Sequence, residues 1–322
     1  MSESEISIKL PAVFDELLKR SIVITGAPRS GTTLLGNIVG TMAGVEYFFE
    51  PPMFHMLSRM HAAGALAAEP ACLLLASYCC DDLLLEAAQG RGVNLRPTDD
   101  SLFLRRHTWS ELNRRWHEVR GRKHAIEATL GRRSRLALKM PNSMDGCELA
   151  AKTFADAYFV ILVRDGRDVV SSVLRRGWVK DSMLDTELWP YRNLELPVNV
   201  PYWVPEAWLE KWQSLGEASR AVLMWCHHAE ISDELTSHAP QRGLNCLTVS
   251  YEELVATPGD TLNRVMTFLG VKPGGATESL VAKIHAGDQS HREGWQAIAQ
   301  NVEPELLHHF YELNRQRGYD KS

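Results

Sequence analysis

The sequence contains no hydrophobic run long enough to cross a membrane. A membrane-spanning helix needs about 20 apolar residues. The most apolar stretches of this sequence, around Leu73–Ala76 and Tyr158–Val163, are far shorter. The segment Met1–Leu10 mixes Ser, Glu and Lys and lacks the apolar centre and small-residue cleavage site of a secretion signal. We therefore expect no integral membrane association and a cytoplasmic location.

Cysteine is scarce and follows no recognisable pattern. The chain has 6 cysteines, without a C-x-x-C pair or the spacing of a zinc site. They are Cys72, Cys79, Cys80, Cys147, Cys226 and Cys246. We expect free thiols in a reducing compartment rather than disulfides or metal ligands.

A general excess of positive charge is also absent. Lys and Arg number 35 against 40 Asp and Glu, a formal net charge of −5. This balance excludes a generally basic surface for nucleic acid, so we expect no nucleic-acid partner. The segment Arg105–Arg135 is an exception, with ten Lys or Arg and three Asp or Glu. We favour a solvated basic helix face for it over a surface for an anionic acceptor or partner.

Short apolar segments alternate with helical ones along most of the chain. The predicted strands are Ser21–Thr25, Leu136–Met140, Tyr158–Val163 and Leu244–Ser250, and the predicted helices include Thr32–Met42, Asp168–Leu174 and Thr261–Leu269, with more between Met56 and Glu86. This alternation predicts an α/β fold with a parallel, doubly wound sheet. The 322 residues show no internal repeat and no Gly/Ser linker, so we expect one domain over residues 1–322.

The segment 177–214 is rich in aromatic residues and proline. It holds five of the 9 tryptophans and four prolines, and the prolines prevent a continuous helix. The tryptophans are Trp178, Trp189, Trp203, Trp208 and Trp212. The segment is either a loop whose rings fill the core or an aromatic flap that forms an acceptor pocket.

The segment Gly26–Thr33 has the position and the spacing of a phosphate-binding loop. Two glycines, Gly26 and Gly31, permit the tight backbone path, and the amides that open the next helix would point at an anion. The spacing is that of G-x-x-x-x-G-K-[ST], but Thr32 stands where nucleotide triphosphatases have a lysine. Arg29 is the cation of this loop.

A second anion-binding pattern follows the strand at Tyr158–Val163. Arg164 ends that strand, and Ser172 lies eight residues later in the predicted helix. An arginine presents two N–H groups to a phosphate, and a serine hydroxyl adds a third donor. Both patterns lie at the carboxyl ends of predicted strands, where open α/β sheets bind their ligands.

Both patterns resemble motifs of the sulfotransferases that use 3′-phosphoadenosine 5′-phosphosulfate (PAPS). Pro28-Arg29-Ser30-Gly31-Thr32-Thr33 is similar to their 5′-phosphosulfate loop, and Arg164 with Ser172 is similar to their 3′-phosphate motif. The resemblance implies a three-layer, P-loop NTPase-like fold with a central parallel sheet flanked by helices. It also implies that these residues bind the donor.

Weaker similarities lie nearer the C-terminus. Val249–Leu254, followed by Pro258 and Phe268–Gly270, is similar to the YEDL…P…FLG region of carbohydrate sulfotransferases. In those relatives the tyrosine that matches Tyr251 lies by the adenine.

The segment Arg292–Trp295 resembles the RKGxxGDW segment of cytosolic sulfotransferases, although it is two residues short. This similarity implies donor contacts by Arg292 and Gly294.

The reaction implied is in-line transfer of a sulfuryl group from PAPS to a hydroxyl or amine of a small-molecule, glycan or lipid acceptor. The product nucleotide is 3′-phosphoadenosine 5′-phosphate (PAP), and no metal is needed. Charge grows on the departing phosphate oxygen, and Arg29 is the expected stabilising group there.

The residue that accepts the acceptor's proton is less obvious. Cytosolic sulfotransferases carry a histidine in a K-x-H motif, but the matching residues are Lys139-Met140-Pro141. Other branches of the family use a glutamate, and Phe48-Phe49-Glu50-Pro51 with His55 is similar to the FEPLxH stretch of carbohydrate sulfotransferases. We expect Glu50 to be the base, made more basic through desolvation by the apolar residues around it, with His55 as the reserve and Lys139 on the sulfuryl group.

Two alternatives stay open at this point. A P-loop kinase for a small metabolite would need a magnesium ligand, for which Asp165 is available, although Thr32 replaces the usual lysine. A catalytically inactive nucleotide-binding homologue would explain the missing K-x-H histidine.

Overall fold

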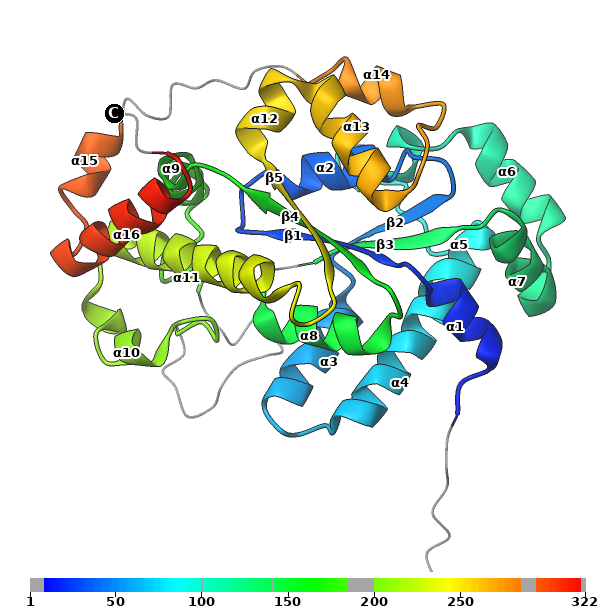
Figure 1. Cartoon of the computed structure of the whole chain (residues 1–322), viewed down its shortest axis with the longest axis horizontal. Coiled ribbons are helices and arrows are strands. Elements are labelled where there is room, and N and C mark those ends of the chain that lie inside the picture. Colours follow the sequence, from blue (N-terminus) through cyan, green and yellow to red (C-terminus); the bar gives the residue numbers. More distant parts are fainter. Residues whose placement is uncertain (1–8, 100, 141, 185–199, 285–293, 320–322) are drawn as a thin grey trace, which may run out of the picture.

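A sheet of five parallel strands forms the centre of the computed structural model, which describes residues 9–99, 101–140, 142–184, 200–284 and 294–319 (Figure 1). The strands are β1 (Ile22–Gly26), β2 (Val45–Phe49), β3 (Arg135–Lys139), β4 (Tyr158–Val163) and β5 (Asn245–Ser250). Their order across the sheet is β2-β3-β1-β4-β5. The four strands predicted from the sequence are present, and the predicted α/β class with a parallel sheet is confirmed.

Helices cover both faces of the sheet. The upper layer in Figure 1 contains α2 (Thr32–Val39), α12 (Tyr251–Ala256), α13 (Pro258–Leu269) and α14 (Thr277–Val281). The lower layer contains α1 (Ala12–Leu18), α3 (Pro52–Ala62), α4 (Ala68–Tyr78), α8 (Met144–Thr153) and α11 (Glu217–His238). The predicted three-layer arrangement follows from these two helical layers.

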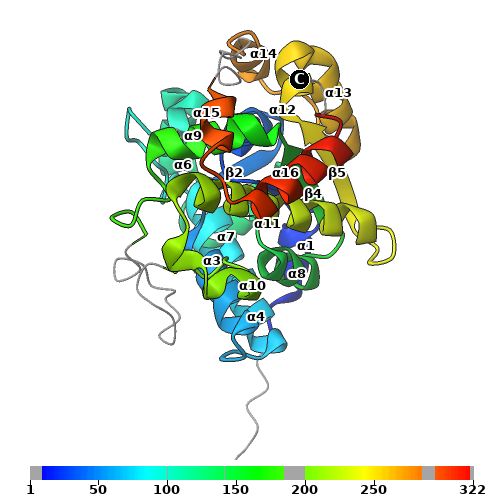
Figure 2. The same cartoon turned by 90° about the vertical axis from the view of Figure 1, so that its left-hand side faces the viewer.

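The remaining elements lie at the two ends of the sheet. At the β2 end are a π-helix (Cys79–Leu85), α5 (Glu86–Ala88), a 3₁₀-helix (Phe103–Arg105), α6 (Trp109–Glu118) and α7 (Gly121–Gly131). On the left of Figure 1, where α9 follows β4, are α9 (Gly166–Arg176), α10 (Glu206–Leu209), a 3₁₀-helix (Trp212–Ser214), α15 (Trp295–Ala299) and α16 (Pro304–Gln316), and Figure 2 looks onto this side.

The central strands are buried because both of their faces are covered. In β1, Ile22 and Ile24 pack into the upper core, and Val23 packs into the lower one. Phe159 and Val160 of β4 divide between the two cores in the same way. Alternating side chains of a strand point to opposite faces, so a strand between two helical layers needs apolar residues throughout.

β2 is a strand that the sequence does not predict. Its apolar residues are interrupted by Glu46, which is nevertheless buried. The carboxylate accepts two hydrogen bonds from the guanidinium of Arg115, at 2.8 and 3.2 Å. Arg115 also donates to the Ala87 carbonyl at 2.8 Å and to Glu111 at 2.6 Å. The partner that makes a buried glutamate acceptable thus comes from 69 residues further along the chain.

The interpretation of Arg105–Arg135 as a solvated basic face does not hold for three of its arginines. Arg115 is 1% exposed. Arg106 donates to Asn37 at 2.8 Å and lies over the ring of Tyr47. Arg135 donates to the backbone carbonyl of Arg20 at 2.8 Å. These side chains fix the segment to the sheet and to α2.

Two further observations concern membrane-spanning helices and the cysteines. No helix within the described ranges is both long and apolar enough to cross a membrane. All six cysteines are free thiols, and burial raises the pKa of Cys80 to about 12.

We predict that Arg115→Ala lowers the free energy of unfolding by about 3–5 kcal/mol, because it leaves the buried Glu46 carboxylate without its partner. Denaturant unfolding followed by circular dichroism measures this change. The control is Arg114→Ala on the same helix, an exposed residue whose loss should cost less than about 0.5 kcal/mol. Equal effects of the two substitutions would contradict a structural role for the Arg115–Glu46 pair.

Candidate active site

The two predicted anion-binding motifs lie side by side at the carboxyl edge of the sheet. β1 and β4 are neighbours and are paired from Ile22 with Tyr158 to Gly26 with Leu162. The chain leaves β1 into α2 on the upper face, whereas it leaves β4 into α9, which packs on α11 of the lower layer. Neighbouring strands whose helices depart to opposite faces open a crevice between their ends.

The loop after β1 has the tight path that its glycines predict. Gly26 has a φ of 150°, and a Cβ atom there would lie 2.3 Å from the Leu162 carbonyl oxygen. Gly31 has a φ of 97°, precedes α2 directly, and would place a Cβ 2.5 Å from the ring of Tyr251. Arg29 also has a positive φ, of 69°. The loop therefore turns sharply and presents the amino terminus of α2 to the crevice.

The cations of the two motifs are joined by direct contacts. Arg29 donates from Nε to Ser172 Oγ at 3.1 Å, and its guanidinium lies 5.5 Å from the ring centroid of Trp178. Arg164 donates to the backbone carbonyl of Arg29 at 3.1 Å, and its guanidinium lies 4.1 Å from the ring centroid of Tyr251. Four residues predicted separately from the sequence thus form one connected group.

A cavity of about 350 Å³ opens beside this group. It is lined by Arg29, Ser172, Arg175 and Arg176. Arg175 and Arg176 were not predicted as site residues, although their spacing of three and four from Ser172 places them on the same face of α9. The cavity has three guanidinium groups and no carboxylate in its lining, an arrangement suited to an anion.

Three buried donors within the two motifs lack a hydrogen-bond partner in the described part of the chain. They are the hydroxyls of Ser30 and Ser171 and the Nε of Arg164. Buried donors normally have partners, so their presence together indicates a site built for a ligand with several oxygen atoms.

A second group of predicted residues lies at the ends of β2 and β3. The Lys139 ammonium and the Glu50 carboxylate form an ion pair, and Lys139 Nζ lies 4.8 Å from the ring centroid of Phe49. The Glu50 amide donates to the Lys139 carbonyl at 2.9 Å, although Glu50 has a φ of 42°. A non-glycine residue held in this strained region is characteristic of functional sites.

The expected desolvation of Glu50 by its apolar neighbours is wrong. The Glu50 side chain is 41% exposed. Phe48 packs against the lower core and Phe49 against the upper core, since successive residues of β2 point to opposite faces. The carboxylate is thus partly exposed, and it pairs with the Lys139 ammonium.

His55 lies in the second turn of α3 and contacts the aromatic segment. Its ring centroid is 5.3 Å from that of Tyr202. Burial, together with the positive charge of Arg59, lowers the pKa of His55 below its usual value of 6.5. The imidazole is therefore neutral at pH 7 and able to accept a proton.

The described aromatic residues of the segment 177–214 divide between the core and the predicted site residues. Trp212 is fully buried, and its ring centroid lies 5.6 Å from that of Trp203. Trp178 and Tyr202 instead lie against Arg29 and His55 of the site. Trp189 lies outside the described residues.

The predicted C-terminal contacts are only partly described. Arg292 lies outside the described residues. Gly294 directly precedes α15, which packs against α9 near the cation group. No hydrogen bond joins Gly294 to the described residues of either motif.

We predict that the pKa of the His55 imidazole lies below 6.5 and that Arg59→Ala raises this pKa. Removal of the positive charge makes the imidazolium less unfavourable, so the pKa rises towards its usual value. NMR titration of the histidine resonances measures the midpoint. Met60→Ala, at an exposed position of the same helix, is the control and leaves it unchanged. An unchanged midpoint in Arg59→Ala would mean that Arg59 has no influence on this histidine.

Comparisons with known proteins concern the fold and the family of the chain. The sulfotransferase domain of an olefin synthase from Synechococcus PCC 7002 is similar to this chain with a TM-score of 0.50 and 17% identity, covering 94% of this chain and 95% of that one. Sulfotransferase STF9 from Mycobacterium avium is similar with a TM-score of 0.46 and 15% identity, covering 97% of this chain and 80% of that one. Mouse sulfotransferase SULT7A1 complexed with PAP is similar with a TM-score of 0.41 and 14% identity, covering 96% of this chain and 90% of that one. No curated protein matched in sequence. The sequence matches the sulfotransferase family over residues 21–273, and the chain is therefore a sulfotransferase of that family.

Proposed function

We propose that the protein transfers a sulfuryl group from PAPS to a hydroxyl or amine of a small-molecule, glycan or lipid acceptor. The observation that carries the proposal is the contact between Arg29 of the first motif and Ser172 of the second, beside a cavity lined by three arginines. PAPS carries negative groups at its 5′ and 3′ ends, so it needs two neighbouring anion sites. The unpartnered donors of Ser30 and Arg164 fit such a ligand.

The proposed donor site extends over both motifs. The residues Pro28 to Thr33 would hold the 5′-phosphosulfate, with the amides at the start of α2 adding donors. Arg164 and Ser172 would hold the 3′-phosphate, with Arg175 and Arg176 at the rim. Tyr251 would lie by the adenine, and Arg292 and Gly294 would complete the site.

The order of the strands supports an acceptor site on the β2 side of the donor. β1, which carries the phosphate loop, β3, which ends at Lys139, and β2, which ends before Glu50, follow one another across the sheet. Strand ends are about 5 Å apart, so a sulfuryl group that leaves a phosphate above β1 towards β2 passes over the end of β3. Lys139 stands at that point.

The proposed chemistry divides among three side chains. PAPS supplies the activated sulfuryl group. Glu50 accepts the proton of the acceptor hydroxyl, Lys139 donates hydrogen bonds to the sulfuryl oxygens, and Arg29 stabilises the charge that develops on the departing phosphate oxygen. The Lys139–Glu50 ion pair holds the two groups next to each other, so that one can contact the acceptor hydroxyl while the other contacts the sulfuryl group. His55, neutral at pH 7, is the reserve base.

The kinase alternative loses support from the surroundings of Asp165. This side chain is fully buried, and both of its oxygens accept hydrogen bonds from Arg167, at 2.6 to 3.1 Å. Asn314 of α16 donates to it as well, at 3.2 Å. A carboxylate occupied in this way is not available to a magnesium ion.

Titration calorimetry of the full chain with PAP and with ATP–Mg²⁺ tests the donor. Binding of PAP, and weak or no binding of ATP–Mg²⁺, supports the proposal, and the reverse supports a kinase. A catalytically inactive homologue would bind PAP but release none from PAPS over a panel of hydroxylated acceptors.

Two coarser proposals complete the function. We propose that residues 1–322 form one domain, because all described helices and strands pack around the same sheet through three adjoining apolar cores. The free thiols support a reducing compartment, the cytoplasm, as the place of action.

We predict that Glu50→Gln lowers kcat by about 100-fold or more, because an amide cannot accept the proton of the acceptor hydroxyl. PAP affinity stays the same, since Glu50 lies at the end of β2, two strands from the phosphate loop. PAP release from PAPS gives kcat, and calorimetry gives the affinity. Glu69→Gln, at an exposed position of α4, is the control. A kcat like that of the native chain in Glu50→Gln would exclude Glu50 as the base.

We predict that Arg164→Ala raises the donor KM more than about tenfold, because a charge-assisted hydrogen bond contributes about 1.5–3 kcal/mol. Steady-state kinetics with PAPS as the varied substrate measures this value. Arg264→Ala on α13, where the arginine pairs with the exposed Glu253, should leave KM unchanged. An unchanged KM in Arg164→Ala would refute its role at the 3′-phosphate.

A further inference from the structure

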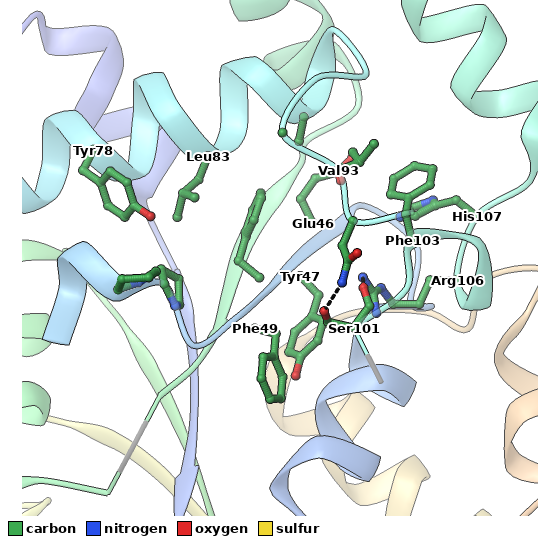
Figure 3. Close-up of a pocket in the computed structure, with 16 residues that line it drawn as sticks. Glu46, Tyr47, Phe49, Tyr78, Leu83, Val93, Ser101, Phe103, Arg106 and His107 are labelled. Atoms are coloured by element: carbon green, nitrogen blue, oxygen red, sulfur yellow. Dashed lines mark hydrogen bonds between the residues drawn. The ribbon is translucent and has the colours of Figure 1, made fainter. Parts of the chain in front are cut away.

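We propose that a cavity beside the edge strand β2 binds the acceptor, and that the acceptor is a small, neutral, single-ring alcohol of the phenol type. This inference rests on the proposed function, because it names the acceptor class for the same transfer. The cavity has a volume of about 210 Å³ and lies between β2, the end of α4 and the segment 92–107 (Figure 3).

The cavity adjoins the proposed catalytic pair. Its lining includes Phe49 and Pro51, the two sequence neighbours of Glu50. The ring of Phe49 also contacts Lys139, whose Nζ is 4.8 Å from its centroid. Glu50 and Lys139 do not themselves line the cavity, but a ligand hydroxyl at this end would lie near them, on the β2 side of the sheet.

The size and walls of the cavity favour a single flat ring. Sites for drug-sized ligands have volumes of about 300–1,000 Å³, and this cavity is smaller. The apolar lining is formed by Phe49, Pro52, Leu83, Val93 and Phe103. Rings packed against such walls gain from burial and from edge or offset contacts between aromatic groups.

The charges around the cavity balance one another. The two terminal nitrogens of the Arg115 guanidinium donate to Glu46. Glu111 pairs with Arg115 and with His107. Arg106 is the second cation, and it lies close enough to Glu46 for the carboxylate to raise its pKa, against a larger lowering by burial. Two carboxylates and two guanidinium groups leave no net charge, so a neutral ligand fits best.

Tyr78 supplies a polar group that faces the cavity. Figure 3 shows its hydroxyl directed into the cavity, and it has no hydrogen-bond partner among the described residues. Burial raises the pKa of Tyr78 to about 12, so the hydroxyl stays protonated and donates. By contrast, Asn94 donates to Ser101 at 2.7 Å, and both are engaged.

This distribution of polar groups distinguishes a phenol from a sugar. A ligand needs one hydrogen-bond acceptor for Tyr78 and one reacting hydroxyl for Glu50. A sugar ring carries several further hydroxyls, and those left without partners in the cavity would lower its affinity. A ring with a hydroxyl at one end and a carbonyl at the other satisfies both positions.

Titration calorimetry with and without saturating PAP tests the cavity, using para-hydroxyacetophenone, para-ethylphenol and methyl glucoside as probes. We expect para-hydroxyacetophenone to bind most tightly, about tenfold better than para-ethylphenol because of its hydrogen bond to Tyr78. Tyr78→Phe should remove this preference while leaving the affinity for para-ethylphenol unchanged. A native chain that prefers methyl glucoside, or binds neither phenol, would overturn the proposal.

Val93→Trp tests the location of the site, because the larger side chain fills the cavity from its loop. The substitution should lower the affinity for para-hydroxyacetophenone at least about tenfold, which corresponds to the loss of one good contact or more. The affinity for PAP should stay unchanged. Leu95→Trp is the matched control, since Leu95 is exposed on the same loop and does not line the cavity. Equal phenol binding by both variants would place the acceptor elsewhere. Loss of PAP binding by the native chain would instead refute the proposed donor, and the titrations without PAP would still decide the cavity.

Discussion

The pairing of β1 with β4 is the contact on which the site depends. At its carboxyl end Gly26 lies so close to the Leu162 carbonyl that any side chain would collide with it. This close approach brings the loop that follows β1 against the residues that follow β4. Arg164 then reaches the Arg29 backbone, and Arg29 reaches Ser172. Two stretches separated by more than a hundred residues become one cationic surface because a parallel sheet aligns the ends of its strands.

The rest of the molecule holds this edge in place with buried polar contacts. Asp165 caps α9 by accepting from the Arg167 amide, and it also binds Asn314 of α16. The C-terminal helix is thereby fixed to the start of α9, which carries Ser172. At the opposite end of the sheet, Arg115 and Glu46 hold the edge strand β2 to α6. In each network the buried carboxylate is paired with an arginine, which is the condition under which buried charges are tolerated.

Residues next to one another in sequence were easier to predict than residues brought together by folding. The phosphate loop could be predicted because two glycines, a cation and a following helix are all local features. Glu50 and Lys139 were each identified, but their ion pair depends on the pairing of β2 with β3, and β2 itself was not predicted. The expected desolvation of Glu50 failed for a related reason. Neighbours in a strand point to opposite faces, so adjacent rings do not enclose the residue that follows them.

The sequence by itself determined the α/β class, the tight path of the loop after β1 and the membership of the sulfotransferase family, because each depends on short-range spacing of residue types. Tertiary structure decided which arginines of Arg105–Arg135 are structural, which aromatic residues of 177–214 reach the site, and where a second cavity opens. These depend on strand order and on partners far away in the chain. Such partners are selected by packing and by the need to pair buried charges, and no local pattern records that selection.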